Sequence, residues 1–142
     1  RLRLAGRGMT GFARGRSWPG VAVEGEVPDA ATFLRSSPVV VVPLLSGSGV
    51  RVKVVEAMAL GRAVVATPRA AEGLGRIEPG RHLLLGDGPD ALAAGLVRAL
   101  ADPGLAARLG EAAWLLARER FSAPAVARAV DSLYHSLPSE AA

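Results

Sequence analysis

The sequence predicts an α/β fold with a doubly wound, mainly parallel sheet. Three observations predict it. Short apolar segments alternate with helical stretches of about 10–20 residues, as in βα repeats. Two of these segments, 39–42 and 63–66, are continuous apolar runs, as expected for strands buried on both faces of a parallel sheet. Glycine or proline marks most boundaries between segments.

The composition fits one globular domain. The chain has 142 residues, of which 50% are hydrophobic and 21% charged, so we expect a sizeable core rather than disorder. No apolar run approaches the roughly 18–20 residues of a membrane span. The absence of cysteine excludes disulfides and thiolate zinc sites, and His82 and His135 lie far apart, so we expect no metal site. We expect a cytoplasmic protein.

The charge is moderately positive, at +4, and the 17 basic residues are all arginine except Lys53. The guanidinium fork suits phosphates and carboxylates, which predicts an anionic ligand or a membrane surface as partner. Biased codon usage, visible also in the many alanines, is the stronger explanation of the arginines as a group. The chain has no block of five like charges and few aromatic residues, so nucleic-acid binding is not expected.

Local signals place the elements along the chain. Glycine and proline in 9–20 allow at most a short helical turn. Asp29 is a good N-cap, and Gly61 ends a helix. In chain order, we expect strands at 1–5, 21–23, 39–42, 63–66 and 81–85, and helices at 29–36, 50–60, 89–101, 105–120 and 122–136.

The loop after the strand 39–42 is a candidate phosphate site. It reads Ser46-Gly47-Ser48-Gly49 and opens the next helix at about Val50. Glycines let a ligand approach the backbone, and the first free N–H groups of a helix carry about half a positive charge. Such a terminus binds phosphate without side chains. By the composition of the loop alone, an ordinary helix start with serine caps is the stronger explanation.

The helix expected at 50–60 is apolar except for Arg51, Lys53 and Glu56. We therefore expect it to be buried on most sides, with its charges at an edge, near a ligand or paired. Lys53 and Glu56 share one face, and Arg51 points roughly 150° away from them. Lys53 and Glu56 form either a surface ion pair or a site where the carboxylate accepts hydrogen bonds from ribose hydroxyls. The spacing does not decide between these.

The stretch 39–67, with Glu-Ala-Met-Ala-x-Gly at 56–61, resembles the donor-binding domain of group 1 (family 4) glycosyltransferases. The resemblance covers nearly the whole chain, through segments 4–8, 23–29, 80–85, 100–103 and 120–122. It implies half of a GT-B architecture, in which the C-terminal of two Rossmann-like domains holds a nucleotide sugar. By this resemblance, residues 1–142 form one nucleotide-sugar-binding domain with C-terminal helices at 103–142. We expect a fragment that lacks the first strand–helix unit and the N-terminal acceptor domain.

The resemblance also assigns site residues. Glu56 matches the glutamate that binds the ribose hydroxyls, while Ser48 stands at the position of the family's other glutamate, which leaves contact with the transferred sugar open. The pattern Gly-x-Arg-x-Lys fits Gly49, Arg51 and Lys53. By that match, the amides of Gly49 and Val50 would face the diphosphate, with Gly47 and Ser48 in the same donor-binding loop. The backbone of Gly25, Glu26 and Val27 would meet the base.

The activity implied is that of a retaining glycosyltransferase that transfers a hexosyl group from a nucleotide sugar to a glycoconjugate or lipid acceptor, as in polysaccharide biosynthesis. No metal is required, and no catalytic residue is assigned. The family's Arg and Lys that neutralise the leaving diphosphate lie upstream of this chain, so we expect it to be inactive alone. The partners implied are the nucleotide sugar and the N-terminal domain, and a peripheral membrane contact would reside mainly in that domain.

Two other functions remain open. Gly6-Arg-Gly8-Met-Thr-Gly11 follows a strand, and Glu24 or Glu26 lies near the position of a ribose-binding acid, which is the pattern of an NAD(P)-type dinucleotide site. The glycine- and proline-rich segment that follows argues against the long helix such a site needs. The other alternative is a non-catalytic α/β domain that has lost its donor site.

Five further residues have simpler interpretations. We expect Trp114 and Phe121 to pack in the core and His82 to be structural. Glu72 matches a family position near the donor pocket, or lies in a solvated turn. Trp18 serves as a lid or as a contact to another domain.

Overall fold

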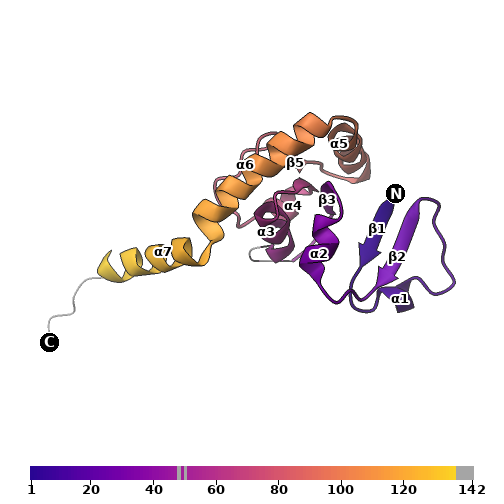
Figure 1. Ribbon diagram of the computed structural model, residues 1–142, viewed down its shortest axis with the longest axis horizontal. Coiled ribbons are helices and arrows are strands. Elements are labelled where there is room, and N and C mark those ends of the chain that lie inside the picture. The colour runs from indigo at the N-terminus through magenta and orange to yellow at the C-terminus, as the bar shows by residue number, and fades with distance from the viewer. Residues whose placement is uncertain (48, 50, 137–142) are drawn as a thin grey trace. The chain divides into compact units, whose positions relative to one another are not determined.

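The computed structural model describes residues 1–47, 49 and 51–136. The chain divides into two compact units, Arg1–Ser36 and Ser37–Ala142. Strands and helices alternate along the first part of the chain, as the sequence predicts (Figure 1). Every strand pairing among the described residues is parallel. In chain order the elements are β1 (Leu2–Ala5), α1 (Met9–Phe12), β2 (Val21–Gly25), α2 (Ala30–Arg35), β3 (Val39–Val42), α3 (Val52–Ala59), β4 (Ala63–Ala66), α4 (Pro68–Ala71), β5 (Leu84–Leu85), α5 (Pro89–Ala101), α6 (Pro103–Phe121) and α7 (Ala123–Ser136).

The first unit is built on the parallel pair β1–β2, in register from Leu2 opposite Val21. Helix α2 begins after Asp29, as predicted, because the Asp29 carboxylate accepts hydrogen bonds from the backbone N–H groups of Ala31 (3.0 Å) and Thr32 (3.1 Å). These hydrogen bonds lower the pKa of Asp29, and the largest cause is a further one from the Thr32 hydroxyl. The segment between the strands forms the short helix α1, as expected.

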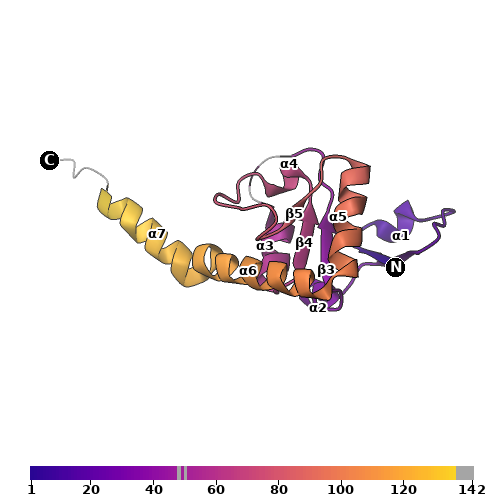
Figure 2. The ribbon, with the colours of Figure 1, turned by 90° about the horizontal axis from the view of Figure 1, so that it is seen from above.

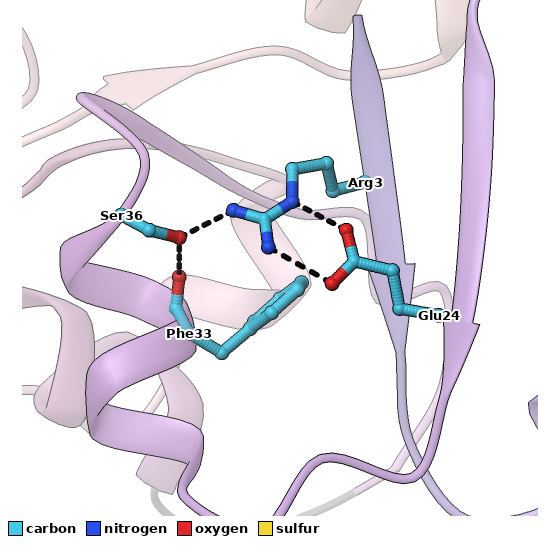
Figure 3. Close-up of polar contacts among 4 residues, drawn as sticks. All are labelled: Arg3, Glu24, Phe33 and Ser36. Atoms are coloured by element: carbon cyan, nitrogen blue, oxygen red, sulfur yellow. Dashed lines mark hydrogen bonds and ion pairs between the residues drawn. The ribbon is translucent and has the colours of Figure 1, made fainter.

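Arg3 links β1, β2 and the end of α2 (Figure 3). From β1, its guanidinium donates hydrogen bonds to both carboxylate oxygens of Glu24 on β2, at 2.5 and 2.8 Å. It also donates to the hydroxyl of Ser36 and lies 4.8 Å from the centre of the Phe33 ring of α2. The hydrogen bond from Arg3 lowers the pKa of Glu24 and, reciprocally, raises that of Arg3.

The second unit has three layers, with the sheet β3-β4-β5 between helices. Alternate side chains of β4 point to opposite faces of the sheet. On one face, Val64 and Ala66 pack in a core cluster with residues of α3 and α6. On the other face, Ala63 and Val65 pack in a second cluster with residues of α5 and α6. Figure 2 shows the three strands side by side, with α5 running along them. All four residues of β4 are buried, which confirms the strand predicted at 63–66.

The four valines of β3 differ from the expectation of burial on both faces. Val42 is buried, but Val39, Val40 and Val41 are partly exposed. Their side chains do alternate between the two core clusters. Burial is incomplete because β3 is an edge strand of its sheet and pairs with β4 alone among the described strands of this unit.

The last strand is shorter than predicted. β5 covers Leu84–Leu85, because the N–H groups of Arg81 and His82 donate to the carbonyl of Glu78 and fold the preceding residues into a turn. The strands also form two sheets, β1–β2 and β3–β4–β5, rather than one.

The C-terminal helices lie close to their predicted positions. α5 covers the predicted 89–101, α6 begins two residues earlier than expected, at Pro103, and α7 follows Ser122, whose hydroxyl accepts a hydrogen bond from the N–H of Ala125. Within the described residues, no helix combines the length and the apolar character needed to cross a membrane.

Candidate functional site

The candidate site lies in the second unit, at the edge where the parallel strands β3, β4 and β5 end. Each strand is followed there by a helix. The loop 43–51 connects β3 to α3, and Thr67 connects β4 to α4. The segment Gly86-Asp87-Gly88 connects β5 to α5. Because all three strands run in the same direction, three helix N-termini lie along this edge. Open α/β sheets bind their ligands at such an edge.

Thr67 fixes the 43–51 loop to the sheet. Its side chain is buried, and its hydroxyl donates a hydrogen bond to the carbonyl of Leu44 (2.6 Å) while accepting one from the N–H of Ala70 (3.2 Å). The Thr67 N–H donates to the carbonyl of Val42 (3.3 Å). Sequence reasoning did not single out Thr67, although a threonine before Pro68 is an N-cap signal.

Two glycines of the loop have left-handed backbone conformations, and their contact with a phosphate stays a prediction. Gly47 and Gly49 have φ angles of 113° and 81°, which other residues rarely adopt. The Arg51 guanidinium lies against Gly47, where a Cβ would come within 3.2 Å of Nη1. Arg51 is therefore placed against the loop itself. Two further predicted site residues, Ser48 and Val50, lie outside the described residues.

Helix α3 begins later than predicted. Its N-cap is Arg51, whose backbone is extended (φ −85°, ψ 91°), and the first helical residue is Val52 rather than residue 50. The carbonyl of Arg51 accepts hydrogen bonds from the N–H groups of Val54 (2.9 Å) and Val55 (3.2 Å), but its side chain does not cap the first turn.

Lys53 and Glu56 lie on the exposed side of α3. The Lys53 ammonium and the Glu56 carboxylate form an ion pair of 2.8 Å, with side chains 63% and 40% exposed. Val54, Ala57 and Met58 face the core, whereas Val52 is 62% exposed. The expectation that α3 is buried on most sides is therefore wrong, because it packs with one side only. The Lys53–Glu56 surface ion pair, one of the two interpretations that the spacing left open, is present. A role of Glu56 in ligand binding stays a prediction.

The other predicted group, Gly25, Glu26 and Val27, belongs to the first unit. Gly25 is buried with φ 72°, its carbonyl accepts a hydrogen bond from the N–H of Gly6 (2.7 Å), and a Cβ there would lie 2.8 Å from the hydroxyl of Thr10. Glu26 is 69% exposed. This position therefore requires glycine, while the contact of the segment with a base stays a prediction.

The geometry of the first unit argues against the dinucleotide alternative. The helix after the Gly6–Gly11 pattern, α1, has 4 residues, and a helix of this length supplies little of the dipole that binds a pyrophosphate. One of the two candidate ribose-binding acids, Glu24, accepts two hydrogen bonds from the Arg3 guanidinium.

Glu72 and His82 make local contacts. The Glu72 carboxylate pairs with Arg69 at 2.7 Å on the surface, as expected for a solvated turn. His82 is buried, and its Nδ1 accepts a hydrogen bond from the N–H of Glu78 (3.0 Å), which confirms a structural role. In the described part of the chain, no group of three or more His, Asp or Glu side chains is placed to hold a metal ion.

The two aromatic residues near the end of the chain differ. Phe121 packs against the core, as predicted. Trp114 is 39% exposed, with the guanidinium of Arg118 4.6 Å from its ring centre, so the expectation that it packs in the core is wrong. The buried residues of α6 beside it are Ala113, Leu116 and Ala117, and Trp114 lies on the outer side of the helix.

Comparisons with known proteins agree with this architecture. The family model for "Glycosyl transferases group 1" matches residues 1–102. The search of curated proteins found no match. Similar solved structures include a glycosyltransferase from Rickettsia africae (TM-score 0.80, 17% identity, 98% of this chain and 40% of that chain), Anabaena HepE in complex with UDP and glucose (0.77, 21%, 95% and 40%) and sucrose-phosphate synthase from Thermosynechococcus elongatus (0.72, 24%, 94% and 37%). The chain thus spans about two fifths of the length of these structures.

Proposed function

Because the chain belongs to the group 1 glycosyltransferases, we propose that it binds a nucleotide-diphosphate sugar as the donor-binding part of a retaining glycosyltransferase. Solved structures with the same fold support a nucleotide-sugar ligand, since HepE was crystallised with UDP and with UDP-glucose. The acceptor we propose is a glycoconjugate or lipid, and the group transferred a hexose.

One observation carries this proposal: α3 presents an ion-paired carboxylate on its exposed side, next to a glycine loop at the carboxyl ends of the strands. The first N–H groups of α3 and the loop amides at Gly47 and Gly49 favour the negative diphosphate. Glu56 lies one turn further along the helix, where its carboxylate accepts hydrogen bonds from the two ribose hydroxyls. Lys53, whose ammonium lies 2.8 Å from the Glu56 carboxylate, adds positive charge beside the diphosphate.

The proposal is tested by NMR titration of the ¹⁵N-labelled chain with UDP, GDP, ADP and NAD in parallel. We expect one nucleoside diphosphate to shift the amides of Gly47, Gly49 and Glu56 selectively, which also identifies the base. Shifts at Gly6–Gly11 with NAD would support the dinucleotide alternative instead. No shift with any of the four, in a folded protein, would indicate a domain without a donor site.

Glu56→Gln is the sharpest variant because it removes the charge and keeps the size. Loss of a charged hydrogen bond, about 1.5–3 kcal/mol, should weaken nucleotide binding about tenfold or more. The matched control is Glu78→Gln, which removes the carboxylate of another exposed pair three residues apart, Arg81–Glu78 at 3.1 Å. Equal affinities for the two variants, with unchanged circular dichroism, would remove Glu56 from the site.

Two statements about catalysis complete the proposal. The chain alone should transfer no sugar from any donor, because a charge-neutralising Arg and Lys for the leaving diphosphate are expected outside it. Sugar release detected by coupled assay with the purified chain would contradict this. Binding should also need no metal, so a chelator such as EDTA should leave the nucleotide affinity unchanged.

A further inference from the structure

The segment 9–20 of the first unit is a second surface with unusual chemistry. It contains two aromatic residues, Phe12 and Trp18, and two arginines, Arg14 and Arg16, and every residue from 14 to 20 is exposed. Residues 1–23 hold five arginines and no Asp or Glu; the first acidic residue is Glu24.

The aromatic side chains form an ordered pair on the surface. The rings of Phe12 and Trp18 stack with their centres 5.7 Å apart and their planes 18° from parallel, and they remain 53% and 36% exposed. The guanidinium of Arg16 lies 5.3 Å from the centre of the Phe12 ring. The two stacked rings thus form an exposed aromatic patch of defined geometry, the kind of surface that marks protein or membrane interaction sites.

Positive charge gathers at the same place. Arg3 and Arg7 face acidic residues, since Arg3 pairs with Glu24 and Arg7 lies 3.8 Å from Glu26. Within the described residues, no ion pair is formed by Arg14 or Arg16. Among the described residues, the charge of Arg14 and Arg16 beside the rings is not neutralised by an ion pair, and it suits an anionic surface.

We propose that this aromatic–arginine loop (Phe12, Arg14, Arg16 and Trp18) docks the first unit on an anionic lipid bilayer. A bilayer surface has an apolar layer directly beneath its phosphate groups. The rings of Phe12 and Trp18 can therefore contact the apolar layer while the guanidinium groups of Arg14 and Arg16 contact the phosphates. Tryptophan is favoured at the headgroup level, and arginine keeps its charge in the polar layer while its stem lies on apolar surface. Anionic lipids attract such basic segments electrostatically. The inference does not depend on the proposed donor site.

The chain contains a matched control surface. Trp114 on α6 is 39% exposed and lies 4.6 Å from the Arg118 guanidinium, so it repeats the aromatic–arginine contact. Its surroundings differ in charge, because Glu111 lies one turn before it and Glu119 follows Arg118. Trp114→Phe should leave bilayer binding unchanged, and it makes Trp18 the single tryptophan of the chain.

The test is co-sedimentation of the chain with vesicles of phosphatidylcholine, with and without about 30% phosphatidylglycerol. We expect at least fivefold tighter binding to the anionic vesicles, weakened when NaCl rises from about 0.05 to about 0.5 M. In Trp114→Phe, the emission of Trp18 should shift to shorter wavelength on these vesicles and be quenched by brominated lipid.

Two double variants separate the contributions. Phe12→Ser with Trp18→Ser should abolish sedimentation with anionic vesicles, and Arg14→Gln with Arg16→Gln should reduce it at least fivefold with an unchanged circular dichroism spectrum. The proposal is overturned if the wild-type chain binds no vesicles, binds neutral and anionic vesicles equally, or binds as well with the arginines replaced. It is also overturned if the chain instead forms dimers in solution that depend on Trp18.

Discussion

Gly110 tests how closely α6 packs on the second unit. There the helix meets the backbone of the turn between α3 and β4: a Cβ at 110 would lie 2.3 Å from the carbonyl oxygen of Gly61 and 3.0 Å from its carbonyl carbon. Gly61 is held with φ 66°, and its N–H donates to the carbonyl of Met58 (2.9 Å). Both partners are backbone, so Gly110→Ala cannot be relieved by turning a side chain.

The expected cost follows from this distance. A carbon and a carbonyl oxygen approach to about 3.3 Å, so the methyl group requires a separation of roughly 1 Å. That movement pulls α6 away from the core around Met58 and Ala113, both fully buried. Overpacking of this kind costs about 1–3 kcal/mol, and the backbone clash places Gly110→Ala near the upper end. The higher helix propensity of alanine offsets about 1 kcal/mol of this destabilisation. We expect a net loss of about 2 kcal/mol in the free energy of unfolding.

Urea and thermal unfolding followed by circular dichroism measure this loss, which corresponds to a fall in Tm of roughly 8 °C. The control is Gly104→Ala in the same helix, where a Cβ would meet no backbone. It would meet the end of the Arg108 side chain (3.3 Å) and the Asp102 carboxylate (3.2 Å), which caps the helix and needs to shift by only a few tenths of an ångström. We expect its stability to change by less than about 0.5 kcal/mol. If both variants were as stable as the wild type, the close backbone contact between α6 and the turn would be refuted.

Three other predictions concern single residues. Thr67→Val should lower the free energy of unfolding in urea by about 1–3 kcal/mol, because the carbonyl of Leu44 loses its hydrogen-bond donor. Thr67→Ser keeps the hydroxyl and should retain most of the wild-type stability. Met58→Ala, at a fully buried site, should cost about 2–5 kcal/mol in the same assay. The pKa of Asp29 is lowered in the folded protein, first by the hydrogen bond from the Thr32 hydroxyl. The Asp29 carboxylate therefore stabilises α2 fully above its unfolded pKa of about 3.9. This stabilisation is lost as the pH falls through the folded pKa. Asp29→Asn should remove this acid sensitivity, measured as the pH dependence of the α2 amide shifts.

The parts of the fold that the sequence predicted well depend on local signals. The Asp29 cap, the alternation of valines in β3 and the start of α5 after Gly88 are each determined within a few residues. β5 and the degree of burial of β3 were predicted less well. How far a strand is buried depends on how many strands pair with it, and a run of four valines carries no information about that number.

In the candidate site, too, the features that depend on neighbouring residues were predicted from the sequence, and the contacts between distant residues were not. The glycine loop and the shared face of Lys53 and Glu56 follow from composition and helical geometry, and the ion pair was one of the two outcomes expected. The contact of Thr67 with Leu44 joins residues 23 positions apart and needs the parallel pairing of β3 and β4 to form. The stacking of Phe12 on Trp18 likewise needs a loop conformation that glycine content alone does not specify.

Helix α3 connects the core to the candidate site. Val54, Ala57 and Met58 are fully buried, and they set the rotation of the helix about its axis. That rotation places Lys53 and Glu56 outward, since residues three and four positions apart share a face. Thr67 holds the start of the preceding loop against the sheet at the same edge. The position of the carboxylate is thus set by apolar packing beneath it. A substitution at Met58 should consequently weaken nucleotide binding as well as folding, whereas Glu56→Gln should affect binding alone.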